Sequence, residues 1–184
     1  MLVDKRNYSK NAIADLISAL PLSFSFYMAY NAIKYLNRYN ILGFVGLITS
    51  SVSADIIKRL PYPKSWEFFI TRPKGANNWD ILSKNDYSNK VKPPGFPSGH
   101  MTAATYFSTY IFYGQKTNRL EKLALLAIVV LTAWARIHKG VHNIPQVLGG
   151  LILGILFAGI FLKLNWLFIF ILKLNIQKKC WITF

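Results

Sequence analysis

Long apolar runs alternate with shorter polar links along the whole chain. The apolar runs cover residues 11–33, 41–57, 98–113, 123–137 and 144–172. Each run is close to the length at which a helix crosses the hydrocarbon layer of a bilayer. The pattern therefore predicts an all-α integral membrane protein with about five transmembrane helices in a bundle.

The polar links divide what we expect to be a single membrane domain, residues 1–184. Residues 1–57 hold the two N-terminal spans, and residues 58–97 form the longest polar stretch of the chain. That stretch mixes basic and aromatic side chains, which is typical of a membrane interface. Residues 98–172 then form a core of three helices, and residues 173–184 form a basic tail.

The charge of the chain changes which partners are expected. The formal net charge is +15, while 53% of the residues are hydrophobic and lie mostly in long runs. A basic nucleic-acid binder would instead spread its cations over a modest core. The charge therefore favours anionic lipid headgroups and an anionic substrate over nucleic acid. The single cysteine, Cys180, excludes an intrachain disulfide and a cysteine-based zinc site. The oligomeric state stays open.

The stretch 93–101 is rich in proline and glycine and ends at the third apolar run. Ser98 stands where the N-cap of a helix belongs, Gly99 leaves backbone N–H groups uncovered, and His100 follows in the first turn. Free N–H donors, the positive end of a helix dipole, a hydroxyl and an imidazole together suit a phosphate group. The alternative is a plain junction between a loop and a helix, with the histidine in solvent.

Counting the spans brings other polar residues to the same place. If the third helix begins at Ser98 and crosses the membrane, the fourth returns to the starting face near Arg136. The fifth begins there, just after His142. The long polar stretch, which carries Arg72, lies on that face as well. We therefore expect an active site at one membrane face.

Three short patterns in this order resemble the motifs of the type 2 phosphatidic acid phosphatase superfamily, which also includes soluble vanadium haloperoxidases. The first is Arg72-Pro73, the second runs from Pro97 to His100, and the third is Arg136 followed six residues later by His142. The resemblance covers residues 64–150. It implies an interfacial active-site loop at 58–97 and a catalytic core at 98–172.

The resemblance also implies an activity. It is the hydrolysis of a lipid phosphate monoester or diphosphate, such as a phosphatidic acid-like lipid or a polyprenyl diphosphate, through a phosphohistidine intermediate. His142 would be the nucleophile, and His100 would be the general acid and then the general base. The phosphate oxygens would be held by basic side chains and by the turn before the third helix, namely Lys64, Arg72, Ser98, Gly99 and Arg136. No metal and no cofactor is implied, because cationic side chains neutralise the phosphate.

The chain departs from the superfamily pattern at two functional positions. The lysine expected seven residues before Arg72 is replaced by Ser65, and Lys64 stands one residue earlier. On an ideal helix a step of eight residues turns about 80° from the starting face, which a long lysine side chain can cover. In the third motif, Gln146 replaces the aspartate that would orient the nucleophilic imidazole. Its amide oxygen can still accept a hydrogen bond.

Two other functions stay open at this stage. A non-catalytic relative could bind anionic lipid headgroups with the same cationic site, and Gln146 favours that alternative. A lipid phosphotransferase could pass the same phosphoryl group to an alcohol. Arg72 and Arg136 taken singly could be interfacial arginines that touch headgroups.

The sequence predicts a multi-pass membrane protein without fixing its compartment. Basic residues flank both ends of the apolar runs, so the excess of Lys and Arg on the cytoplasmic side does not decide the orientation. The resemblance implies that the site faces the lumen or the extracytoplasmic side.

Overall fold

The computed structural model of the chain describes residues 12–73, 76, 78–80, 83–85 and 94–182. In this part of the chain, long helices form at all five predicted apolar runs. They are α1 (Ala12–Tyr35), α2 (Arg38–Lys58), α4 (Gly99–Gly114), α5 (Arg119–His138) and α6 (Ile144–Ile182). The predicted helical class is confirmed.

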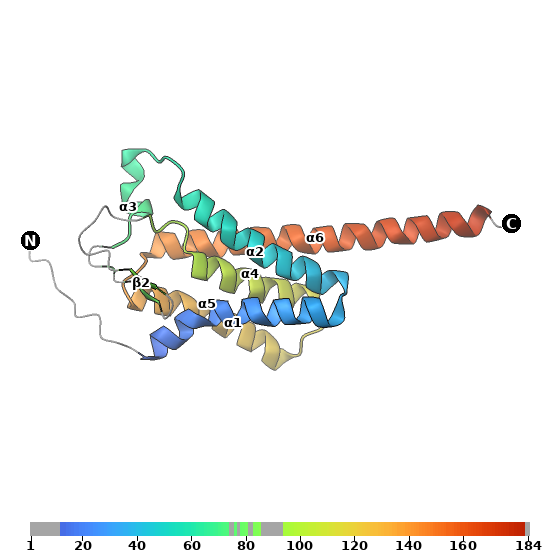
Figure 1. Cartoon of the computed structure of the whole chain (residues 1–184), viewed down its shortest axis with the longest axis horizontal. Coiled ribbons are helices and arrows are strands. Elements are labelled where there is room, and N and C mark those ends of the chain that lie inside the picture. Colours follow the sequence, from blue (N-terminus) through green and yellow to red (C-terminus); the bar gives the residue numbers. More distant parts are fainter. Residues whose placement is uncertain (1–11, 74–75, 77, 81–82, 86–93, 183–184) are drawn as a thin grey trace, which may run out of the picture.

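The helices lie alongside one another, with α4 among the others (Figure 1). The short helix α4 contacts α6 most extensively and also touches α1, α2 and α5. Its residues from Met101 to Ser108 are all buried. Since α4 begins at the predicted phosphate-binding turn, its central place fixes that turn against its neighbours.

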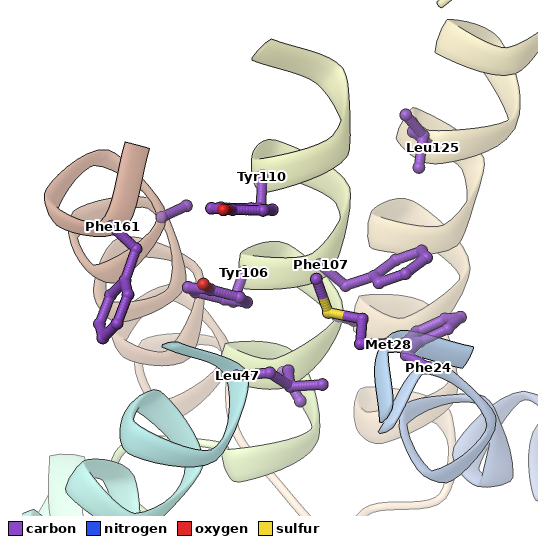
Figure 2. Packing of buried hydrophobic residues seen from close by; sticks show 11 residues of the cluster. Phe24, Met28, Leu47, Tyr106, Phe107, Tyr110, Leu125 and Phe161 are labelled. Atoms are coloured by element: carbon purple, nitrogen blue, oxygen red, sulfur yellow. The ribbon is translucent and has the colours of Figure 1, made fainter. Parts of the chain in front are cut away.

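Three aromatic side chains of α4 belong to the main hydrophobic core, which also contains residues of α1, α2, α5 and α6. Figure 2 shows Tyr106, Phe107 and Tyr110 reaching toward the other helices. Phe107 stacks on Phe24 of α1 with ring centroids 4.3 Å apart. Tyr106 meets Phe161 of α6 edge to face at 6.3 Å. Burial of such large rings stabilises the contacts between these helices.

Glycines allow α6 to approach the backbone of α4. A Cβ added to Gly150 would stand 2.5 Å from the carbonyl oxygen of Ser98, and one added to Gly154 would stand 2.7 Å from that of Thr102. Any larger residue would force the two helices apart. This close contact sets the start of α4 directly against the first turns of α6.

The polar stretch contains only short elements where it is described. They are the 3₁₀ helix η1 (Lys64–Trp66), the helix α3 (Glu67–Ile70), and the strands β1 (Asn78–Asp80) and β2 (Ser83–Asn85). The two strands are antiparallel, with Asn78 paired to Asn85. Residues 74–75, 77, 81–82 and 86–93 of the predicted interfacial loop lie outside the described residues.

Several boundaries differ from the predicted ones. Helix α5 begins at Arg119 instead of 123, because Asn118 and Glu121 form a capping box. Helix α6 continues without a break through residues 173–182, where the sequence suggested a separate basic tail. Figure 1 shows this end of α6 extending beyond the other helices.

Three of the helices are long and apolar enough to cross a membrane. They are the helices 12–35 and 38–58 and the segment 144–171 of α6. Helix α4 has 16 residues, so it is about 24 Å long. Length and composition therefore identify three candidate spans among the described helices, while five spans remain a proposal.

Candidate active site

The ends of three helices meet at one end of the molecule. Helix α4 begins there, α5 ends there at His138, and α6 begins there at Ile144 (Figure 1). The connection 139–143 is held to α1 by an ion pair between Lys139 Nζ and Asp15 Oδ1, 2.7 Å long. This end carries the predicted site residues of the second and third motifs.

The turn before α4 has an unused hydroxyl. Ser98 is the N-cap residue of α4, yet its side chain makes no capping hydrogen bond. Its Oγ is buried and has no hydrogen-bond partner among the described residues. Its backbone N–H donates instead to the carbonyl oxygen of Gln146, at 2.9 Å. The hydroxyl thus retains its hydrogen-bonding capacity beside the positive end of the α4 dipole.

His142 lies in the connection between α5 and α6 and is only 3% exposed. Its Nδ1 lies 3.0 Å from Oε1 of Gln146. Burial lowers the pKa of His142 well below its ordinary value of 6.5, and the nearby charges of Arg136 and Arg72 lower it further. His142 is therefore a neutral imidazole at physiological pH.

The two arginines both precede this imidazole in sequence and lie close to it in space. Arg136, in the last turn of α5, is 1% exposed. Arg72 donates from Nη1 to the carbonyl oxygen of Val141 at 3.3 Å. Both guanidinium groups are close enough to His142 to lower its pKa, as is His100 from the first turn of α4. Arginine forks suit the non-bridging oxygens of a phosphate.

Gln146 lies in the first turn of α6 and is fully buried. Its backbone N–H donates to Oδ1 of Asn143 at 3.1 Å, and its Oε1 accepts the backbone N–H of Asn143 at 3.3 Å. This reciprocal pair is a capping box at the start of α6. The box fixes Gln146 beside His142.

The cations on the α2 side of the site are lysines. A pocket of about 490 Å³ is lined by Lys58 and Lys64 together with Tyr62, Ile70 and Thr71. Of the two lysines, Lys58 lies closer to the turn before α4. A Cβ added to Gly99 would stand 3.3 Å from Lys58 Nζ. This amine also pairs with Asp55 at 2.6 Å, and its side chain is 17% exposed.

The structure therefore brings most of the predicted site residues into one region. Contacts or mutual electrostatic influence connect Arg72, Ser98, His100, Arg136, His142 and Gln146. Gly99 follows Ser98 as the first residue of α4. Lys64 lines the adjoining pocket. The catalytic and binding roles of all eight residues stay predictions.

Sequence reasoning missed three contributors to this region. Asn143 had a detectable signal, since an Asn three residues before a Gln at a helix start is the pattern of a capping box. Lys58 lies 14 residues before Arg72 in the sequence, and this distance gives no hint of its position. Thr71 acts through its backbone carbonyl, which no side-chain pattern can reveal.

Among the described residues, no three His, Cys, Asp or Glu side chains gather as a metal site would require. The absence of a metal from the reaction stays a prediction.

Fold and site together define a helical protein with a cationic, histidine-containing site where α4, α5 and α6 meet. A family model described as the PAP2 superfamily matches residues 35–170. The chain belongs to the PAP2 superfamily, so the resemblance to the type 2 phosphatidic acid phosphatases is confirmed. The matched range includes α2 to α5, most of α6 and every candidate site residue.

No curated protein and no solved structure matches the chain. Members of the PAP2 superfamily are generally phosphatases, so the family indicates phosphoester hydrolysis.

Proposed function

We propose that this protein hydrolyses a lipid phosphate, a phosphatidic acid-like monoester or a polyprenyl diphosphate, through a phosphohistidine formed on His142. The observation that carries the proposal is the position of the buried imidazole of His142. Its Nδ1 is held by Gln146, and the charges of Arg72 and Arg136 are close by. A neutral imidazole with one nitrogen engaged keeps a lone pair on the other nitrogen for attack.

In the first step, Nε2 of His142 attacks the phosphorus atom. A P–N bond forms as the bond from phosphorus to the leaving oxygen breaks. His100 donates a proton to that oxygen, so the leaving alcohol or phosphate departs in neutralised form. Arg72, Arg136, the N–H of Gly99 and the hydroxyl of Ser98 hold the non-bridging oxygens.

In the second step, water attacks phosphorus from the side that the leaving group has vacated. His100, now neutral, takes a proton from that water. The P–N bond breaks, the electron pair returns to Nε2 of His142, and inorganic phosphate leaves. Both histidines regain their starting protonation, so the cycle closes without any other reactant.

A lipid substrate follows from the outer surface of the helices. Exposed leucines, isoleucines and phenylalanines cover much of α1, α2 and α6, as bilayer contact would require. The outward side of α5 carries the same kind of residue, including Leu123, Leu126 and Val130. We therefore propose that α4 and α5 cross the membrane with the other three and that the site lies at one membrane face.

Single cysteines can test the five-span arrangement. Leu60 follows α2 on the site side, and Lys116 lies between α4 and α5 at the opposite end; both are exposed. In a Cys180→Ser background, we expect Leu60→Cys and Lys116→Cys to react with an impermeant maleimide from opposite sides of sealed vesicles. Reaction of both from the same side would mean that α4 and α5 do not cross. The superfamily resemblance favours the extracytoplasmic or lumenal side for Leu60→Cys.

Phosphatase assays on detergent-solubilised protein test the activity itself. We expect release of inorganic phosphate from lipid phosphates to continue in the presence of EDTA, because cationic side chains neutralise the phosphate oxygens. Vanadate should inhibit, since it mimics pentacoordinate phosphorus. Loss of turnover on chelation, or turnover that vanadate leaves untouched, would contradict the proposed chemistry. Transfer of phosphate to an added alcohol in preference to water would indicate a phosphotransferase.

A further inference from the structure

Gln146 bridges segments from all three motifs. Its Nε2 donates to the carbonyl oxygen of Thr71, at 2.7 Å. Its Oε1 lies 3.0 Å from Nδ1 of His142, and its backbone carbonyl accepts the N–H of Ser98 at 2.9 Å. Thr71 immediately precedes Arg72, so one residue touches the first, second and third motifs.

These partners fix which way round the amide stands. The carbonyl oxygen of Thr71 can only accept, so the group facing it must be the NH₂ of Gln146. The backbone N–H of Asn143, 3.3 Å away, can only donate, so the group facing it must be the amide oxygen. That same oxygen faces Nδ1 of His142, and Nδ1 must therefore carry the proton of the neutral ring. The lone pair is left on Nε2.

The surroundings of the amide leave little room for another arrangement. Gln146 is fully buried. A Cβ added to Gly95 would stand 2.5 Å from its Oε1 and 2.8 Å from its Nε2, so only glycine fits behind the amide. The backbone N–H of Gly95 donates to the carbonyl oxygen of Ile70, which holds the same segment from the other side.

The segment 68–72 is tied to the connection between α5 and α6 by further bonds. Asn143 Nδ2 donates to the carbonyl oxygen of Phe68 at 2.8 Å, and Arg72 Nη1 donates to that of Val141 at 3.3 Å. The bond from Gln146 to Thr71 is the shortest of the three, and it ends on the residue that immediately precedes Arg72. A carboxylate at position 146 could orient the imidazole, but it has no hydrogen to donate to Thr71.

We propose that Gln146 is a positioning residue with two tasks, selecting the Nδ1–H form of the His142 ring and tying the Arg72 segment to the nucleophile. This inference rests on the proposed function for its effect on turnover. The glutamine can then replace the expected aspartate. It lacks the negative charge of a carboxylate, but its NH₂ group donates a hydrogen bond that holds Thr71. This tether acts where Thr71 is in extended backbone after α3 ends.

Gln146→Glu separates the two tasks, since it keeps the length and an acceptor but loses the donor. We expect the carboxylate to repel the Thr71 carbonyl and to loosen the Arg72 segment, so that KM rises and kcat/KM falls about 10- to 100-fold. The added negative charge should favour the imidazolium against Arg72, Arg136 and His100. The acidic limb of the kcat/KM profile should therefore move to higher pH. Gln146→Leu should lose both tasks and retain still less activity.

Nitrogen NMR of histidine-labelled protein tests the ring directly and needs no turnover. The chain has only three histidines, so His142→Ala assigns the signal. We expect the wild-type ring to be neutral and protonated at Nδ1 near neutral pH, and to lose this single form in Gln146→Leu. An Nε2–H ring in the wild type, an unaltered ring in Gln146→Leu, or a Gln146→Glu enzyme with unchanged KM and acidic limb would overturn the inference. An Nδ1–H ring in a wild type without turnover would uphold the orientation and refute the phosphatase proposal.

Discussion

Replacing His142 by alanine is expected to lower kcat/KM for a lipid phosphate by roughly 10³-fold or more, because the substitution removes the nucleophile itself. The same protein should no longer form an acid-labile phosphorylated intermediate when it is quenched during turnover. In the wild type, burial and the nearby arginines hold the pKa of His142 well below 6.5. The ring therefore stays neutral as the pH falls through 6.5. We expect the acidic limb of kcat/KM that this group causes to lie below pH 6.5.

His138→Ala is the matched control for this experiment. His138 ends α5 and is exposed, and its ring stacks on Trp134 with centroids 4.8 Å apart. The change is the same in both variants, and the two positions are four residues apart. We expect the His138 variant to keep wild-type turnover. An active His142→Ala enzyme that still forms the intermediate would show that another group is the nucleophile.

The helices could be predicted from the sequence because each is a long apolar run between polar links. Their ends were harder to place. The start of α5 depends on side-chain and backbone bonds between Asn118 and Glu121. The length of α6 was missed because the lysines after residue 172 suggested a separate tail, whereas the helix continues to Ile182.

The part of the candidate site that is made of side chains could be predicted from the sequence. Counting spans brought Ser98, Arg136 and His142 to one end, and the structure places them there. The bonds that arrange the site were out of reach, because they end on backbone carbonyls of Phe68, Thr71 and Val141. A carbonyl is present at every residue, so no sequence pattern marks the ones that matter.

The choice of the first-motif lysine could not be made from helical geometry. The choice of Lys64 assumed that an ideal helix joins it to Arg72. In the structure, residues 64–66 form a 3₁₀ turn, α3 ends at Ile70, and Thr71 is extended with φ −78° and ψ 140°. The angle between positions 64 and 72 on a helix therefore has no meaning here. Lys64 stays a prediction, and Lys58 becomes its competitor.

The second large effect that we expect is a loss of kcat/KM when Lys58, rather than Lys64, is replaced. Lys58 Nζ lies against the Gly99 position, is held by Asp55, and is mostly shielded from solvent, whereas Lys64 is exposed on the rim of the same pocket. A charged hydrogen bond to phosphate contributes about 1.5–3 kcal/mol, so Lys58→Met should lower kcat/KM roughly 10- to 150-fold. Lys64→Met, which makes the same change on the same pocket, should lower it less than about threefold, because exposed charges are well screened. The reverse order in steady-state kinetics would return the phosphate-binding role to Lys64. A similar large loss in both variants would mean that the two amines hold the phosphate together.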